Sequence, residues 1–132
     1  MRIIVDTNVL IRSATRDNSS QADIADELLR SAASIAISVS SLCEFSWVLR
    51  RIYRFSTAEV CSGIRALLDI SKVVTNRPVV EAGLAFMQAG GDFADGAIAY
   101  EGRWLGGETF VSFDRKAVEL VASQGYSAQL LS

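Results

Sequence analysis

The chain has 132 residues, of which 50% are hydrophobic and 21% charged, as is typical of one globular domain. Its 13 Lys and Arg against 15 Asp and Glu give a net charge of −2, which argues against a globally cationic nucleic-acid binder. The chain contains no histidine, which excludes Ser-His-Asp and Cys-His triads and zinc sites built on imidazole. Catalysis would therefore have to use carboxylates, hydroxyls, Lys or Arg, or a metal held by oxygen.

Neither the cysteines nor the apolar stretches indicate secretion or a membrane. Cys43 and Cys61 lie far apart and form no CxxC pair, so we expect them to be small buried residues in a reducing compartment. The N-terminus reaches Asp6 after only three apolar residues and lacks a signal-peptide core. No stretch approaches the ~20 apolar residues of a membrane span. We therefore expect a cytoplasmic protein with a single domain over residues 1–132.

Short β-branched runs alternate with longer helical patterns along the chain. The helical patterns begin at a capping-box-like pair, Ser20 and Asp23, at a better one, Ser56 and Glu59, and at Pro78. A helix carrying Glu44 follows the turn at 40–41, the helix from Pro78 stops at 90–91, and further helices cover 92–100 and 115–123. The strands are predicted at 3–5, 35–39, 72–75 and 109–111, with a weaker candidate at 126–131.

This alternation predicts an α/β fold. Strands that are apolar on both faces and separated by helices imply a parallel sheet covered on both sides, with right-handed crossovers. Ligands bind such sheets beyond the carboxyl ends of the strands. The residues that directly follow each strand are therefore the first place to look for chemistry.

Acidic residues stand at these positions. Asp6 and Asp114 follow strands, while Glu44, Asp92 and Asp95 lie in the first turns of apolar helices. Each has a purely structural alternative: an Asx-turn for Asp6, a helix N-cap for Asp114, and one cap with one supporting acid for the pair at 92 and 95. Carboxylates crowded at one sheet edge would repel one another unless a cation neutralised them. Oxygen ligands alone suit Mg²⁺ or Mn²⁺, which support phosphoryl chemistry with a metal-activated water.

With these residues in place, the sequence resembles the PIN-domain family, and within it the VapC ribonuclease toxins of toxin-antitoxin pairs. The resemblance rests on the opening strand with Asp6-Thr7-Asn8-Val9-Leu10, on Glu44, on the block DFADGAIAY, and on VSFD ending at Asp114. It covers nearly the whole chain. Any one of these motifs is weak, but their order, spacing and number together are specific.

The resemblance implies a three-layer α/β/α sandwich with a roughly five-stranded parallel sheet. It implies a homodimeric endoribonuclease that uses Mg²⁺ or Mn²⁺, cuts structured RNA such as tRNA or rRNA, and is inhibited by a cognate antitoxin whose tail covers the toxin's groove. The relatives' metal-binding acids fall on Asp6, Glu44, Asp95 and Asp114, with Asp92 as an accessory acid. Asn8 and Ser112 match supporting positions, and Gly96 departs from the alanine that relatives often carry, at a cost in helix stability of ~1 kcal/mol.

RNA held beside an acidic metal site needs basic residues on its phosphates. The best candidates are Arg115 and Lys116, next to Asp114, followed by the i,i+4 pair Arg12 and Arg16; an ordinary solvated helix face is the alternative for each. Three further arginines follow the turn that carries Glu44: Arg50, Arg51 and Arg54.

The apolar residues of the same segment surround nearly its whole circumference, so those that the core does not use predict a dimer or antitoxin surface. The residues concerned are Phe45, Trp47, Val48, Leu49, Ile52, Tyr53 and Phe55.

Two other functions stay open at this point. A PIN-like module without turnover could act only in a regulatory complex, although the intact set of four acids argues against it. A Mg²⁺-dependent phosphatase of the haloacid-dehalogenase type would need a second aspartate two residues after the first, and Asn8 occupies that position.

Overall fold

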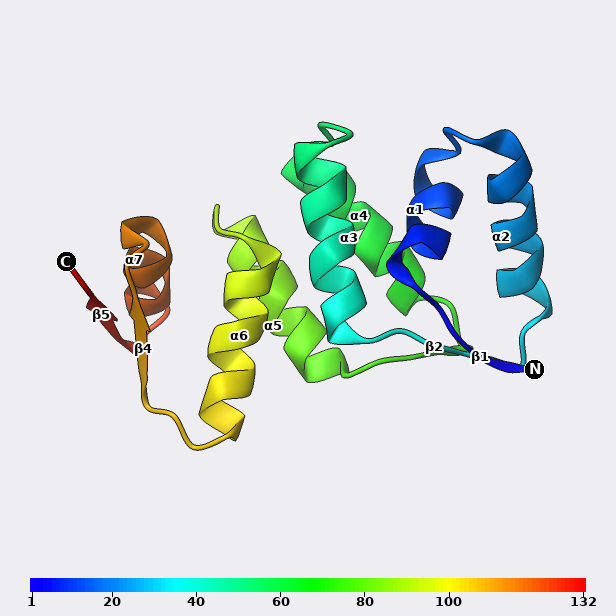
Figure 1. Ribbon diagram of the computed structural model, residues 1–132. Coiled ribbons are helices and arrows are strands. Elements are labelled where there is room, and N and C mark those ends of the chain that lie inside the picture. Colours follow the sequence, from blue (N-terminus) through cyan, green and yellow to red (C-terminus); the bar gives the residue numbers. More distant parts are fainter. The chain divides into compact units, whose positions relative to one another are not determined.

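The computed structural model describes all 132 residues and divides into two compact units, Met1–Arg77 and Pro78–Ser132. Helices and parallel strands alternate along the chain, which confirms the α/β class (Figure 1).

The first unit carries a three-stranded parallel sheet in the order β1-β2-β3. Ile3 of β1 pairs with Ile35 of β2, which in turn pairs with Val73 of β3. Two helices connect each strand to the next, and α1 packs against both α2 and α3 (Figure 1). The elements are β1 (Arg2–Ile4), α1 (Thr7–Thr15), α2 (Ser19–Ser31), β2 (Ser34–Ala36), α3 (Val39–Arg51), α4 (Thr57–Leu68) and β3 (Val73–Val74).

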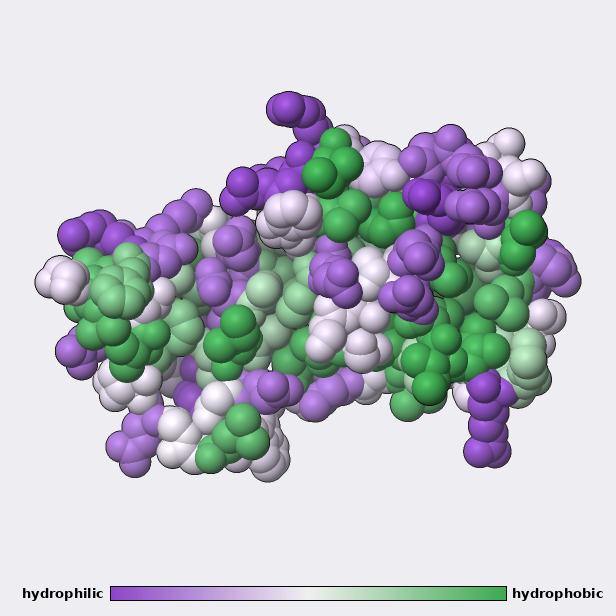
Figure 2. Space-filling view, viewed as in Figure 1, coloured by the Kyte–Doolittle hydropathy of each residue, from purple (hydrophilic) through white to green (hydrophobic).

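One face of this sheet is packed within the first unit. Ile35 and Val73 are buried, together with helix residues such as Leu10, Phe45 and Ile64. Along the same strands, Ile4 is 87% exposed and Val74 61% exposed. Figure 2 accordingly shows apolar surface in the region of β1 and β2.

The second unit is built around a two-stranded parallel sheet. Phe110 of β4 pairs with Ala128 of β5, and both pack against a buried cluster that contains Phe86, Ala99 and Val121. The elements are α5 (Arg77–Gln88), which starts at the last residue of the first unit, α6 (Phe93–Trp104), β4 (Thr109–Ser112), α7 (Arg115–Ser123) and β5 (Ser127–Leu130).

The prediction of one five-stranded sheet is wrong, because the five strands form separate sheets of three and two. The strand at 126–131, the weakest by sequence, is present as β5 (Ser127–Leu130). Strand composition identifies which segments are extended, whereas the pairing of one strand with another depends on contacts that no single segment encodes. The number of sheets therefore could not be predicted from the composition of the strands.

The caps predicted from sequence are confirmed in one case and corrected in others. Ser56 and Glu59 form a complete capping box at the start of α4. α2 starts earlier than predicted, because Asn18 caps it by accepting a hydrogen bond from the Gln21 amide, and Ser20 and Asp23 lie inside the helix. The start of α3 is likewise earlier than predicted, with Ser38 as its cap. An amide side chain caps as well as a hydroxyl, so composition alone does not choose between neighbouring polar residues.

Two expectations about the compartment can be compared with the structure. None of the helices combines the length and the apolar character that crossing a bilayer requires. Neither Cys43 nor Cys61 forms a disulfide. Cys61 is buried as expected, which raises the pKa of its thiol, whereas Cys43 is only half-buried.

Gly96 fills a role that its comparison with alanine did not anticipate. It lies where α6 crosses α5 so closely that an alanine Cβ would overlap the Phe86 side chain and lie 2.8 Å from the Ala82 carbonyl oxygen. Helix propensity alone counts this glycine as a cost. The structure shows that the missing Cβ is what allows the two helices to approach.

We predict that Gly96→Ala lowers the free energy of unfolding by about 1–3 kcal/mol, because overpacking outweighs the better helix propensity of alanine. Gly102→Ala is the matched control in the same helix, since nothing lies within 4 Å of a Cβ added there. That variant should gain about 0.5–1 kcal/mol. Urea unfolding of both variants measures the difference, and equal gains would contradict the close approach of α5 and α6.

Candidate functional site

The predicted acids fall into two groups, one in each unit. Asp6 and Glu44 belong to the first unit and form the N-terminal acidic group. Asp92, Asp95 and Asp114 belong to the second and form the C-terminal acidic group.

Thr7 connects the two members of the N-terminal group. Asp6 is the N-cap of α1, and its Oδ1 accepts a hydrogen bond from the Thr7 amide at 2.8 Å. The Thr7 hydroxyl donates to Oε1 of Glu44 at 3.2 Å, across 37 positions of sequence. Thr7 is not among the site residues predicted from the sequence. The sequence signal that could have identified Thr7 is a hydroxyl directly after a capping acid.

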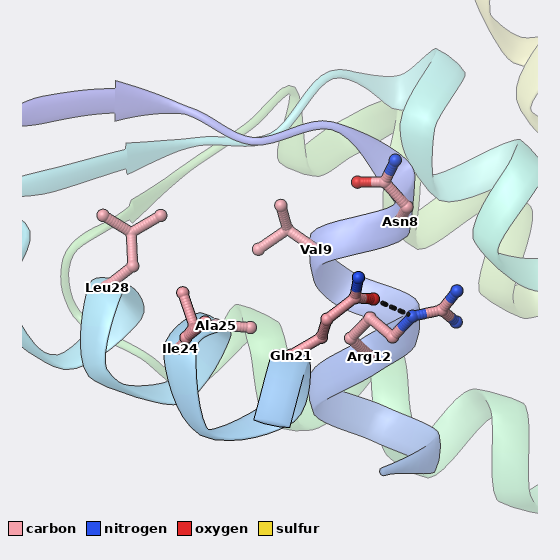
Figure 3. Close-up of a pocket in the computed structure, with 7 residues that line it drawn as sticks. All are labelled: Asn8, Val9, Arg12, Gln21, Ile24, Ala25 and Leu28. Atoms are coloured by element: carbon pink, nitrogen blue, oxygen red, sulfur yellow. Dashed lines mark hydrogen bonds between the residues drawn. The ribbon is translucent and has the colours of Figure 1, made fainter. Parts of the chain in front are cut away.

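Asn8 is predicted to support the acids. It lines a groove of about 340 Å³ between α1 and α2 (Figure 3). The floor of the groove is apolar, and Arg12 crosses it to donate from Nε to the Gln21 side-chain oxygen at 2.7 Å (Figure 3). The hydrogen bond that reaches Glu44 thus comes from Thr7, the residue before Asn8.

In the C-terminal group, Asp114 is held by backbone and hydroxyl contacts. It is the N-cap of α7, with Oδ1 accepting from the Ala117 amide at 3.2 Å. Its own amide donates to the Ser112 hydroxyl oxygen at 2.9 Å. The alternative proposed for Asp114 alone, a helix cap, is therefore present. It uses one carboxylate oxygen and leaves the other for a ligand.

Asp92 occupies the N-cap position of α6, yet its side chain makes no capping hydrogen bond. The structural alternative in which one acid of this pair caps the helix through its side chain therefore does not hold. Asp95 lies in the first turn of the same helix. Both acids line a small pocket of about 40 Å³ together with Asp114 and Lys116.

The crowding of these carboxylates is visible in the electrostatics of Asp95. Burial raises the pKa of Asp95 above its usual value, and the negative charges of Asp92 and Asp114 raise it further. A nearby cation would relieve both of these effects. Without a cation, the pocket therefore disfavours the negatively charged form of Asp95.

The donor chemistry of both groups fits a hard divalent cation. All five side chains offer carboxylate oxygens, which Mg²⁺ and Mn²⁺ prefer, and the chain has no histidine to compete. No three acidic or thiol side chains are gathered tightly enough to make a ready-formed metal site. The acidic residues therefore match a divalent cation in the chemistry of their oxygen ligands, and not through a ready-formed coordination geometry.

The predicted RNA-binding residues differ in how far the protein already engages them. Arg16 forms ion pairs with both Asp23 and Asp26 of α2. Arg12 is bonded to Gln21 and pairs with Asp17 at 3.3 Å. These two arginines therefore join α1 to its neighbours.

Arg115 and Lys116, by contrast, are exposed at the start of α7, and Lys116 lines the pocket of the C-terminal group. Three arginines that follow Glu44 in sequence are exposed as well: Arg50, Arg51 and Arg54.

The apolar segment around α3 is divided as expected between core and surface. Phe45 and Leu49 are each 1% exposed and belong to the core. Trp47 and Ile52 are 57% and 61% exposed. The segment therefore offers apolar area beyond what packing within the chain uses.

Comparison with known proteins gives one clear result. The family model described as PIN domain matches residues 3–121, which include both acidic groups. No match was found among curated proteins.

We predict that Asp114→Ala lowers the free energy of unfolding by about 1 kcal/mol, because it removes the cap of α7. Asp92→Ala should cost nothing measurable, since its side chain makes no capping bond. Urea unfolding without divalent metal compares the two. A loss in Asp92→Ala as large as in Asp114→Ala would show that Asp92 caps α6 after all.

Proposed function

The chain belongs to the PIN-domain family, whose members are generally metal-dependent nucleases, and we propose that it is an endoribonuclease acting as the toxin of a toxin-antitoxin pair. The observation that carries the proposal is the family match over residues 3–121 together with a full set of carboxylates inside it. The proposed substrate is structured RNA such as tRNA or rRNA, and the proposed place of action is the cytoplasm.

The residues proposed to hold Mg²⁺ or Mn²⁺ are Asp6, Glu44, Asp95 and Asp114. Bound there, the ion would lower the pKa of a water molecule and neutralise charge on the scissile phosphodiester. Asp6 and Asp114 each use one oxygen at a helix N-terminus, which fixes the carboxylate while leaving the second oxygen for a ligand. Asp92, free of capping, would add a further negative charge or hold an ordered water.

Basic residues supply what an acidic site lacks for RNA. We propose that Lys116 and Arg115 bind the phosphates that flank the scissile bond. Their exposure and the place of Lys116 beside Asp114 support this assignment. Arg12 and Arg16 are weaker candidates, because ion pairs and hydrogen bonds already occupy them.

The proposed partners are a cognate antitoxin and a second copy of the chain. The exposed apolar residues Trp47 and Ile52 support a protein-protein surface on the first unit. The groove between α1 and α2 is a second apolar surface there, beside Ile24, which is 69% exposed.

The test of the activity uses purified protein, free of any antitoxin, incubated with total cellular RNA and Mg²⁺ or Mn²⁺. We expect cleavage that EDTA abolishes, because the carboxylates cannot replace the charge of the ion. Asp6→Asn and Asp95→Asn should reduce cleavage to background, since each removes a charged ligand without changing side-chain size. Sequencing of the new RNA ends identifies the substrate.

Glu101→Gln is a matched control, because it neutralises an exposed carboxylate of α6 that belongs to neither acidic group. Wild-type protein that cuts RNA no faster than Asp6→Asn would contradict the proposal and favour a binding module without turnover. Release of inorganic phosphate from small phosphomonoesters, with RNA left intact, would favour the phosphatase.

The dimer is tested by sedimentation. We expect the wild-type chain to sediment as a dimer and Trp47→Asp as a monomer, because a charge there would be buried without a partner. A monodisperse wild-type monomer would contradict the dimer.

A further inference from the structure

We propose that Thr7 is a positioning residue that sets Asp6 and Glu44 in place for the cation. The inference rests on the proposed function, because it concerns two of the acids assigned there. It concerns the first unit alone, where all three residues lie.

Thr7 is unusual in its burial. It is 7% exposed and one of only three buried polar residues in the chain, whereas Asp6 and Glu44 on either side of it are exposed. A buried hydroxyl needs a hydrogen-bond partner, and Glu44 supplies one at 3.2 Å. The hydroxyl is therefore committed to one orientation.

The same residue touches both acids through different atoms. Its amide donates to Asp6 at 2.8 Å, and its hydroxyl donates to Glu44. Each acid thus has one oxygen bonded to Thr7 and a second oxygen left for a ligand. Because the two donors belong to one residue, they fix the acids relative to each other as well as to the backbone.

Glu44 depends on this contact more than Asp6 does. A glutamate in the middle of α3 has three rotatable side-chain bonds and loses that freedom when it binds an ion. A hydrogen bond present before binding removes part of that cost. The branched Thr7 side chain is stiff about χ1, which directs the hydroxyl more firmly than a serine would.

Helix capping does not explain the presence of the Thr7 hydroxyl. Asp6 already caps α1, and Thr7 is the first residue of the helix. Thr57 stands at the same position of α4, after the cap Ser56, and forms no hydrogen bond with an acid of either group. The two threonines therefore share a local role and differ in the contact with Glu44.

The test compares Thr7→Val, which keeps the shape and removes the hydroxyl, with Thr7→Ser and with the control Thr57→Val. Mn²⁺ binding is measured by electron paramagnetic resonance of the free ion, without RNA. RNA cleavage is then measured as a function of Mn²⁺ concentration and of RNA concentration. Urea unfolding without metal reports whether each variant folds, and Thr7→Ala replaces the valine variant if that one does not.

We expect Thr7→Val to weaken Mn²⁺ binding about 10- to 100-fold, the usual effect of losing a residue that orients a metal ligand. The Mn²⁺ concentration for half-maximal cleavage should rise by the same factor, with KM for RNA unchanged at saturating metal. Thr7→Ser should recover most of the affinity, and Thr57→Val should match the wild type.

The outcomes separate this inference from the proposed function. Wild-type protein that neither binds Mn²⁺ nor cuts RNA would overturn both. Wild-type protein that does both, with Thr7→Val binding Mn²⁺ equally well, would overturn the inference alone. Equal losses in Thr7→Val and Thr57→Val would also overturn it, because the effect would then belong to helix starts in general.

Discussion

The first turn of every helix leaves backbone amides without a partner, and a polar side chain just before the helix can satisfy one of them. In this chain Asp6, Asn18, Ser38, Ser56 and Asp114 do so. Capping is therefore the common constraint on the ends of these elements. It also determines where carboxylates stand, because an aspartate that caps a helix after a parallel strand lies where such sheets bind ligands.

Capping and ion binding can share one carboxylate, since each aspartate has two oxygens. Asp6 and Asp114 illustrate this: one oxygen of each accepts from a backbone amide. Asp92 also stands at an N-cap position, although between two helices, and does not use its side chain as a cap. Whether an acidic residue caps a helix and whether it binds an ion are thus separate questions at each position. The hydrogen bonds of its individual oxygens show whether it caps a helix.

Local features of the sequence predicted local structure well. The capping box of Ser56 and Glu59 is visible in four residues, and so is the strand-aspartate junction at Asp6. Contacts between segments that are distant in the sequence could not be predicted. The bond from Thr7 to Glu44 spans 37 positions, and the ion pairs that occupy Arg16 depend on how α2 packs on α1. The division of five strands into two sheets has the same origin, because pairing is a property of the assembled chain.

The crossing of α5 and α6 limits which residues the chain can carry at position 96. Asp95 directly precedes Gly96, the residue at which α6 touches Phe86. A larger side chain at 96 would push the first turn of α6 outward and carry the carboxylates of Asp92 and Asp95 with it. A position that carries no polar atom can therefore restrict the chemistry of this chain, because Phe86 and Ala82 leave no room for a side chain there.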